Sequence, residues 1–120
     1  MEIETRLSDQ IARYLDLTTS DVKLTAANMA NIDTPGYRSL GMDFGSEMRE
    51  AINDLDQARR PRSVRVTAVD GLIARPDGND VSMDRESLNL AEAQLKFKTG
   101  VALLREEFQR VMDAIHADSK

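Results

Sequence analysis

Four arginines gather in one short segment and could contact a polyanion. Arg59, Arg60, Arg62 and Arg65 stand together in a chain whose formal net charge is −5. A basic cluster of this kind is typical of nucleic-acid contact. However, the segment holds no aromatic residue on which a base could stack. We therefore expect a solvated loop or a charge-complementary contact with an acidic neighbouring subunit. Nucleic-acid binding through these arginines, or a helical cytosolic adaptor, stays open as the alternative.

A second cluster is acidic and could hold a cation. Its members are Asp77, Asp80, Asp84 and Glu86, but their spacing does not match a calcium-binding EF-hand loop. Roles in turns and helix caps fit them better. The chain has one histidine, His116, and no cysteine, which excludes two-histidine and cysteine-based metal sites, disulfides and a thiol nucleophile. No pattern of acids predicts acid–base catalysis.

The run ANMANIDTPGY, from Ala27 to Tyr37, is the most specific pattern in the chain. Asn28 and Asn31 are three residues apart and share one face at the end of a helix. They predict hydrogen bonds to neighbouring backbone or to a partner helix, and Asn31 or Asp33 could cap the helix end. The TPGY run that follows has the sequence of a type II turn, in which glycine takes a positive φ.

Two long helices must position these residues, because apolar side chains recur at helical spacing near both ends of the chain. The N-terminal stripe consists of Leu7, Ile11, Tyr14, Thr18, Val22, Thr25, Met29 and Ile32. The C-terminal seam consists of Leu90, Phe97, Val101, Leu104, Phe108, Val111 and Ile115, and a second stripe of Leu88, Ala91, Leu95 and Ala102 lies beside it. Pairing the two helices buries one seam and leaves the second stripe without a partner. The surplus apolar face predicts association with other chains.

We expect one mainly α-helical domain over residues 1–120. Two long amphipathic terminal helices, at 1–32 and 84–118, would pack as a coiled-coil-like core, and residues 33–83 would connect them through a short helix and a loop or β-hairpin. No stretch approaches the ~20 apolar residues of a membrane span. The first ten residues carry acids and no apolar run, so they do not predict a cleavable secretory signal.

Within the connecting segment, residues 46–58 predict a short helix with Ser46 or Gly45 as its N-cap. Alternating apolar residues over 64–73 predict a small hairpin with a type I′ turn at Asp70-Gly71. At the start of the C-terminal helix, Asp84 is expected as the N-cap. Met83 and Leu88 would then pack together as a hydrophobic staple.

Three segments, in the right order, resemble signatures of the axial proteins of the bacterial flagellum, the rod and hook proteins. ANMANIDTPGY is similar to their N-terminal signature. Residues 42–48 resemble the region after the turn in the proximal rod proteins, the FlgB family, and GNDVSMDRE at 78–86 resembles the start of that family's C-terminal helix. Between Asp56 and Gly78 the chain is shorter than the resemblance leads us to expect, which leaves room for at most a small hairpin.

The resemblance implies a structural subunit of the proximal rod, without catalytic activity or cofactor. It implies stacking with further copies and with other rod proteins into a helical, periplasm-spanning drive shaft, contact with basal-body ring and export-gate components, and type III export without a cleaved signal. It implies no nucleic-acid partner and no lipid insertion. The packing signature carried over from the family consists of Asn28, Ala30, Asn31, Thr34, Pro35, Gly36, Tyr37, Asp43, Phe44, Gly78, Asn79, Val81, Met83, Asp84 and Glu86.

Overall fold

The computed structural model describes residues 2–118, with side chains from Arg6 onward. Met1, at the start of the predicted N-terminal helix, and residues 119–120, at the end of the predicted domain, lie outside the described residues. The elements in chain order are α1 (Glu2–Ala30), β1 (Leu40–Gly41), α2 (Phe44–Asp56), β2 (Thr67–Ala68) and α3 (Met83–Asp118). The predicted mainly helical fold, with two long terminal helices, is therefore confirmed.

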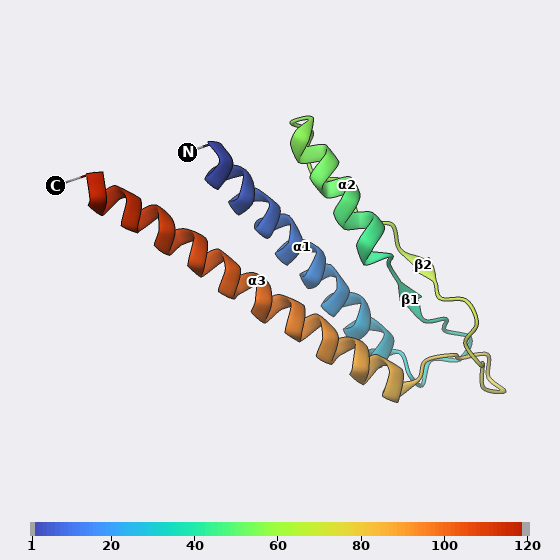
Figure 1. Ribbon diagram of the computed structural model, residues 1–120. Helices are drawn as coiled ribbons and strands as arrows, with labels where there is room; N and C mark the ends of the chain where they lie inside the picture. The colour runs from blue at the N-terminus through green and yellow to red at the C-terminus, as the bar shows by residue number, and fades with distance from the viewer. Residues whose placement is uncertain (1, 119–120) are drawn as a thin grey trace.

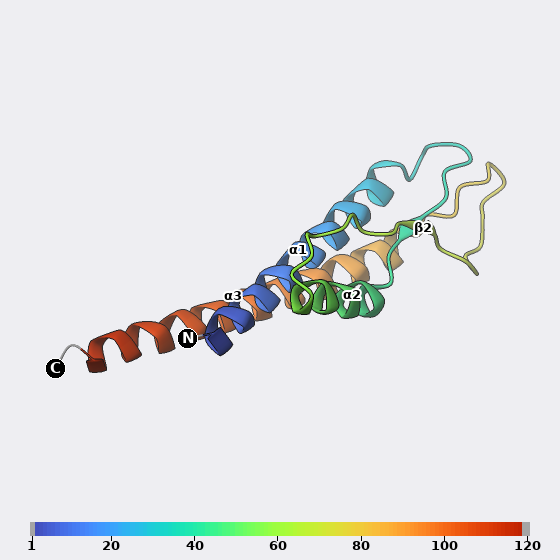
Figure 2. The same ribbon diagram turned by 90° about the horizontal axis from the view of Figure 1, so that it is seen from above.

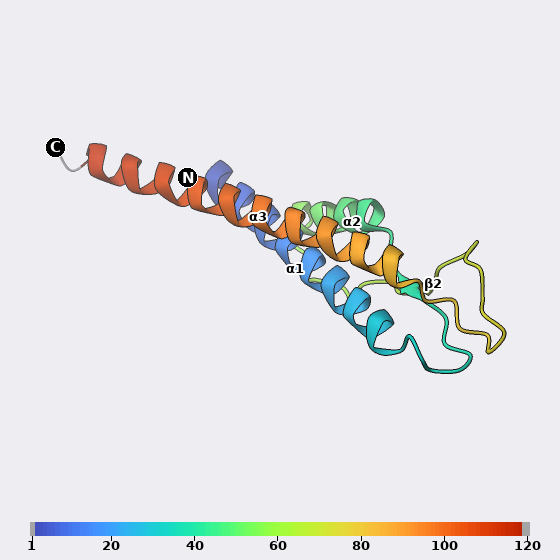
Figure 3. The ribbon, with the colours of Figure 1, turned by 90° about the horizontal axis from the view of Figure 1, so that it is seen from below.

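The two long helices run antiparallel, so both chain ends lie at the same end of an elongated molecule (Figure 1). α2 packs beside α1, and α3 continues past the start of α1 (Figures 2 and 3). The molecule measures 70 × 27 × 18 Å and has a radius of gyration of 18.5 Å. A compact chain of this length has a radius of gyration of about 14 Å. The shape is that of a rod, with a thin layer of packed side chains.

A heptad pattern joins α1 to α3. Among the buried residues of α1, Ile11, Thr18 and Thr25 follow one another at steps of seven, and Leu17 and Asn28 lie outside this series. On α3 the buried residues also follow at steps of seven, and they are Glu86, Ala93, Gly100 and Glu107. This repeat is the one that keeps two helices in contact along a coiled-coil seam. The predicted coiled-coil-like pairing is confirmed, but small and polar side chains occupy much of its contact line.

The large apolar residues of the predicted C-terminal seam do not fill that contact. Phe97, Phe108 and Ile115 are 44%, 66% and 55% exposed, and on α1 Leu7 is 39% exposed. A Cβ atom on Gly100 would lie 2.6 Å from Cδ2 of Leu15. The Leu15 side chain of α1 therefore occupies the space over Gly100, and the prediction that Phe97, Phe108 and Ile115 fill the contact was wrong. Partly buried seam residues beside the contact line are Val22, Met29, Val101, Leu104 and Val111.

α2 begins two residues earlier than predicted, and its N-cap is Asp43 rather than Ser46 or Gly45. Oδ1 of Asp43 accepts a hydrogen bond from the Ser46 amide at 3.1 Å, and Oδ2 accepts from the Ser46 hydroxyl at 3.0 Å. These bonds lower the pKa of the Asp43 carboxyl below its usual value, because they stabilise its charged form. An aspartate caps better here because both its oxygens reach the first turn.

The connecting segment contains a small antiparallel β-pair, as predicted, but with a different partner. β2 pairs with β1, with Leu40 opposite Ala68 and Gly41 opposite Thr67. Asp70-Gly71 therefore does not join two strands of a local hairpin. The returning chain approaches β1 closely, since a Cβ on Gly41 would lie 3.0 Å from Cγ2 of Val69. Long-range pairing of this kind has no short-range sequence signal.

α3 also begins slightly earlier than predicted. The Ser82 hydroxyl accepts a hydrogen bond from the Arg85 amide at 3.3 Å, and the Ser82 carbonyl accepts from the Glu86 amide at 2.9 Å. Ser82 is therefore the N-cap, and the prediction of Asp84 in that place was wrong. Met83 and Leu88 are 40% and 61% exposed, so the expected hydrophobic staple does not bury them.

Candidate functional site

The two flagellar-type signatures meet at the end of the molecule opposite the chain termini (Figure 1). We call this region the loop junction, and define it as residues 28–40 and 75–86. Backbone bonds cross between the two segments. The Gly36 amide donates to the Asp77 carbonyl at 2.9 Å, and the Asp80 amide donates to the Tyr37 carbonyl at 3.2 Å. Backbone hydrogen bonds thus connect two segments that are about forty residues apart in the sequence.

Asn28 fixes the path of the chain between α1 and β1. Its side chain is 1% exposed. Nδ2 donates to the Leu40 carbonyl at 2.8 Å, and Oδ1 accepts from the Leu40 amide at 3.0 Å and from the Tyr37 hydroxyl at 3.1 Å. An asparagine amide can present a donor and an acceptor at once, as one peptide group does to another. The predicted hydrogen bonding of Asn28 to neighbouring backbone is confirmed.

Asn79 plays the equivalent part in the second segment and is fully buried. Nδ2 donates to the carbonyls of Asn31 at 2.9 Å and Thr34 at 2.8 Å, and Oδ1 accepts from the Val81 amide at 2.8 Å. Both carbonyls also accept backbone amides, from Thr34 at 3.0 Å and from Tyr37 at 3.2 Å, so Asn79 adds a second hydrogen bond to each. At the end of α1, Nδ2 of Asn31 donates to the Ala27 carbonyl at 2.8 Å, which confirms its predicted capping role.

Two glycines allow the two segments to touch. Gly36 has φ +75°, and the Tyr37 amide donates to the Thr34 carbonyl at 3.2 Å, so the predicted β-turn with a positive-φ glycine is confirmed. Gly78 has φ +87°, and a Cβ placed on it would lie 3.3 Å from Cα of Gly36. Both the backbone conformation and the close approach therefore favour glycine.

The acidic cluster of the junction serves its turns. Oδ1 of Asp80 accepts from the Ser39 amide at 2.6 Å, and Oδ1 of Asp77 accepts from the Asn79 amide at 3.0 Å. Burial raises the pKa of the Tyr37 hydroxyl, and the nearby charges of Glu86 and Asp80 raise it further. Within residues 2–118, no group of three or more metal-ligating side chains is placed to hold an ion.

Phe44 connects the junction to all three helices. The ring meets Tyr14 of α1 edge to face, with centroids 5.5 Å apart and an interplanar angle of 84°. Nζ of Lys96, from α3, lies 4.1 Å from the Phe44 centroid. Edge-to-face packing and a cation over an aromatic face are both favourable. The first residue of α2 is thus fixed against both long helices.

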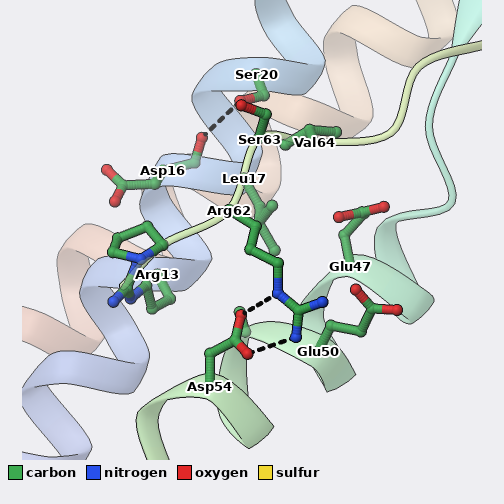
Figure 4. A pocket seen from close by; sticks show the side chains of 12 residues that line it. Arg13, Asp16, Leu17, Ser20, Glu47, Glu50, Asp54, Arg62, Ser63 and Val64 are labelled. Atoms are coloured by element: carbon green, nitrogen blue, oxygen red, sulfur yellow. Dashed lines mark hydrogen bonds and ion pairs between the residues drawn. The ribbon is translucent and has the colours of Figure 1, made fainter. Parts of the chain in front are cut away.

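The arginine cluster lies along α2, where residues 57–66 return past α1; we call this segment the arginine strap. Figure 4 shows Arg62 directed at Asp54, with Nη2 2.6 Å from Oδ1 and Nε 3.1 Å from Oδ2. Arg59 also contacts Asp54, at 3.2 Å, and Arg65 reaches Glu47 at 3.2 Å. The acidic residues that these arginines contact therefore lie on α2 of the same chain, whereas the sequence predicted a solvated loop or an acidic neighbouring subunit. The hydrogen bond from Arg62 lowers the pKa of Asp54 below its usual value.

Comparison with known proteins assigns the chain to a family. No family model matches it. It is 32% identical over 119 residues to the flagellar basal body rod protein FlgB of Salmonella typhimurium, covering 84% of this chain and 86% of the relative. The corresponding protein of Cereibacter sphaeroides is 31% identical over 119 residues, with coverage of 89% and 91%. The chain belongs to the FlgB family of flagellar basal body rod proteins. A more distant member, from Escherichia coli, is 26% identical over 121 residues.

The FlgB-type signature residues divide into two groups in the structure. Asn28, Asn79, Val81 and Glu86 are buried, and Asn31, Tyr37 and Phe44 are partly buried, so these residues shape the fold itself. The exposed members are Ala30, Thr34, Pro35, Gly36, Asp43, Gly78, Met83 and Asp84. Membership of the FlgB family explains why the signatures occur in one chain. The structure shows that hydrogen bonds join the N-terminal signature to the segment that precedes α3.

Sequence reasoning missed the contact line of α3, formed by Ala93 and Gly100 between Glu86 and Glu107. The signal was present as a repeat of seven, but large apolar residues at neighbouring positions concealed it. His116 lies exposed in the last turn of α3. Among the described residues of this FlgB-family chain, no helix is both long enough and apolar enough to cross a membrane.

Proposed function

We propose that the chain is a structural subunit of the proximal flagellar rod and assembles through its two terminal helices. Its partners are further copies of itself, other rod proteins, and ring and export-gate components of the basal body. Family membership supports the rod role. The observation that carries the mode of assembly is the apolar surface of α3, where Leu88, Leu95, Phe108 and Ile115 are each more than half exposed.

The total exposed surface agrees with this role. The chain exposes 8264 Å², whereas a compact monomer of 13.4 kDa exposes about 6,500 Å². Leu103 and Met112 add further exposed apolar surface on α3, at 46% and 44%. Large exposed apolar patches mark contact sites with other molecules. Assembly would therefore cover the apolar side chains of α3 that are exposed in the single chain.

α3 packs against α1 on one face and leaves the opposite face open to another subunit. One face carries Ala93 and Gly100 against α1. The second predicted stripe, Leu88, Ala91, Leu95 and Ala102, is exposed throughout, and it lies about 180° around the helix from Glu86 at 3.6 residues per turn. Contacts between unlike surfaces that do not close into a ring generate helical filaments. The exposed stripe is therefore suited to a neighbour along the shaft.

The alternative of nucleic-acid binding or a cytosolic adaptor is not supported. Arg59, Arg62 and Arg65 pair with acids of α2, and a phosphate would have to compete with these bonds. Charge pairs that are already made add little to binding of a polyanion.

The proposal is tested by deletion in cells of the source bacterium. Strains producing the chain without residues 1–31, or without residues 84–118, are expected to lack it in purified basal bodies and to be non-motile. A strain with Asp70→Asn in an exposed loop is the control and should swim normally. Swimming by either deletion strain, with the shortened chain absent from its basal bodies, would refute the role in the rod.

A further inference from the structure

Two rows of side chains on α3 repeat the same spacing at different places. In each row the residues follow one another at steps of three, four, three and four. The first row is the exposed stripe with Lys98 at its fourth position, and it consists of Leu88, Ala91, Leu95, Lys98 and Ala102. The second, which we call the end row, consists of Val101, Leu104, Phe108, Val111 and Ile115. Alternating steps of three and four are typical of the layers of a coiled coil.

The end row has room for a further helix beside α1. Glu107, which is buried, marks the side of α3 that faces α1. Phe108 and Ile115 lie about 100° and 80° around the helix from it, at 3.6 residues per turn. They are 66% and 55% exposed. α3 also continues past the start of α1, so its last turns are open on the α1 side as well (Figure 2).

A shift of about 13 residues brings the two rows level, position by position. It places Phe108 of one helix beside Leu95 of another. It also places large side chains against small ones, with Leu104 at Ala91 and Ile115 at Ala102. Corresponding positions meet in layers in a parallel coiled coil, and alternation of large and small side chains lets such layers interlock. The two rows therefore fit one another in shape.

The same shift pairs opposite charges. Residues 94–105 contain three basic side chains and no acid, whereas residues 106–118 contain four acids and one arginine. Parallel helices without a shift would place like charges side by side, which is unfavourable. Shifted by about 13 residues, the basic segment lies along the acidic one. One step beyond the two rows, the next layer would join Arg105 of one helix to Asp118 of the other, and both are exposed.

We propose that the end row of α3 docks on the exposed stripe of a second copy of this chain, with the helices parallel, shifted by about 13 residues, and joined by an ion pair between Asp118 and Arg105. The inference rests on the proposed function, since it names the two surfaces that meet in the assembly. The contact joins unlike surfaces and leaves one of each free, so further copies add in the same way. Successive copies would be displaced by about 20 Å along α3, at 1.5 Å per residue.

The first test maps the layers with introduced cysteines, because the chain has none of its own. A mixture of Ala102→Cys and Ile115→Cys chains, oxidised with copper phenanthroline, is expected to form a mixed disulfide dimer on a non-reducing gel. Either variant alone should give about tenfold less dimer, because its cysteines would lie too far apart to join. Gln109→Cys replaces Ile115→Cys in the matched control. Gln109 is exposed near the same end of α3 but lies about 120° around the helix from Ile115.

The second test reverses the charges of the ion pair. Arg105→Glu or Asp118→Arg alone should raise the concentration for half-maximal association about tenfold in sedimentation velocity, because each places like charges in one layer. The two changes together restore an opposite pair and should return association to within about twofold of the unaltered chain. Arg105→Glu with Asp113→Arg has the same net charge but should not recover, because Asp113 lies about 140° around the helix from Asp118. The melting temperature should stay the same in all variants, since these side chains are exposed.

Four outcomes would each overturn the inference. They are equal cross-linking of Gln109→Cys and Ile115→Cys, strong cross-linking of Ile115→Cys with itself, no recovery in the double charge reversal, and no self-association of the unaltered chain. None of them bears on the deletion strains. If those strains fail to swim while the cross-links and the charge reversal also fail, the rod role stands and the subunits meet through other surfaces.

Discussion

The loop junction and the seam between the long helices are held together in opposite ways. At the junction, Asn28 and Asn79 each make three hydrogen bonds while almost wholly buried. Along the seam, Ala93 and Gly100 offer little apolar surface. Large side chains that would strengthen the seam, such as Phe108, are exposed instead. The junction satisfies its buried polar groups within the chain, whereas the seam leaves large apolar side chains exposed.

This difference assigns separate tasks to the two regions. Satisfied buried polar networks fix a unique geometry, so the junction sets how α1 turns into the connecting segment and how that segment leads into α3. Thin packing leaves apolar surface for other chains. A subunit that must present its helices to neighbours benefits from both, because the junction holds the helices while their outer faces stay open.

The largest loss in the free energy of unfolding is expected from Asn28→Ala, in the loop junction. It leaves the Leu40 amide, the Leu40 carbonyl and the Tyr37 hydroxyl without their partner. We expect a loss of about 3 kcal/mol in the free energy of unfolding, measured by urea denaturation. Asn53→Ala is the control, since Asn53 is an exposed asparagine on α2. Equal losses in the two variants would mean that the junction is not the stronger region.

The next largest effect is expected at the seam, from Gly100→Leu. A Cβ at this position already lies 2.6 Å from Cδ2 of Leu15 and 3.1 Å from Cδ1 of Tyr14, so a leucine must push the helices apart. Overpacking of this kind costs about 2 kcal/mol. Amide exchange should quicken along α1 and α3 while the junction keeps its protection. Gln94→Leu, exposed on the same helix, should leave exchange unchanged. If it accelerates exchange equally, the effect is not steric.

The contrast also separates what the sequence predicts well from what it does not. The helices, the TPGY turn and the hydrogen bonding of the Asn28 side chain depend on local periodicity and local turn chemistry, and the structure confirms them. The face of α3 that meets α1 depends on how closely the side chains of Leu15 and Tyr14 approach Gly100. Counting large apolar residues selects the wrong side of the helix, because the smallest side chains permit the closest contact.

Contacts between residues that are distant in the sequence are also not predicted by local patterns. Arg62 and Asp54 are joined across a turn of the chain, and β1 pairs with β2 across the whole of α2. Each depends on where the connecting segment lies once α2 is packed on α1. The caps at Asp43 and Ser82 differ from the predicted ones by two or three positions, because several neighbouring residues can cap a helix and tertiary contacts select among them.

A smaller effect is expected at the arginine strap from Asp54→Asn. The pKa of Asp54 is lowered mainly by the hydrogen bond from Arg62, against a usual value of 3.8. Its charged form therefore contributes stability above that value, and the contribution is lost as the pH falls through the lowered pKa. The variant should melt a few degrees lower at neutral pH, and the gap should close below pH about 4. If the difference in melting temperature between the variant and the unaltered chain persisted at pH about 2, the charge of Asp54 would not be its cause. Asp70→Asn is the control.

The smallest change in the stability of the monomer is expected from Leu95→Ser. This variant therefore contrasts most sharply with changes in the loop junction. Leu95 is 68% exposed on the stripe that faces away from α1. Exposed substitutions of this kind change the free energy of unfolding by no more than about 0.5 kcal/mol. If the stripe is an assembly surface, basal bodies should nevertheless contain much less of the variant than of the unaltered chain. Ile73→Ser is the matched control, because Ile73 is 92% exposed in a loop outside the stripe. Full incorporation of Leu95→Ser would move the assembly surface elsewhere on the helices, whereas a large loss of monomer stability would show that the stripe belongs to the fold.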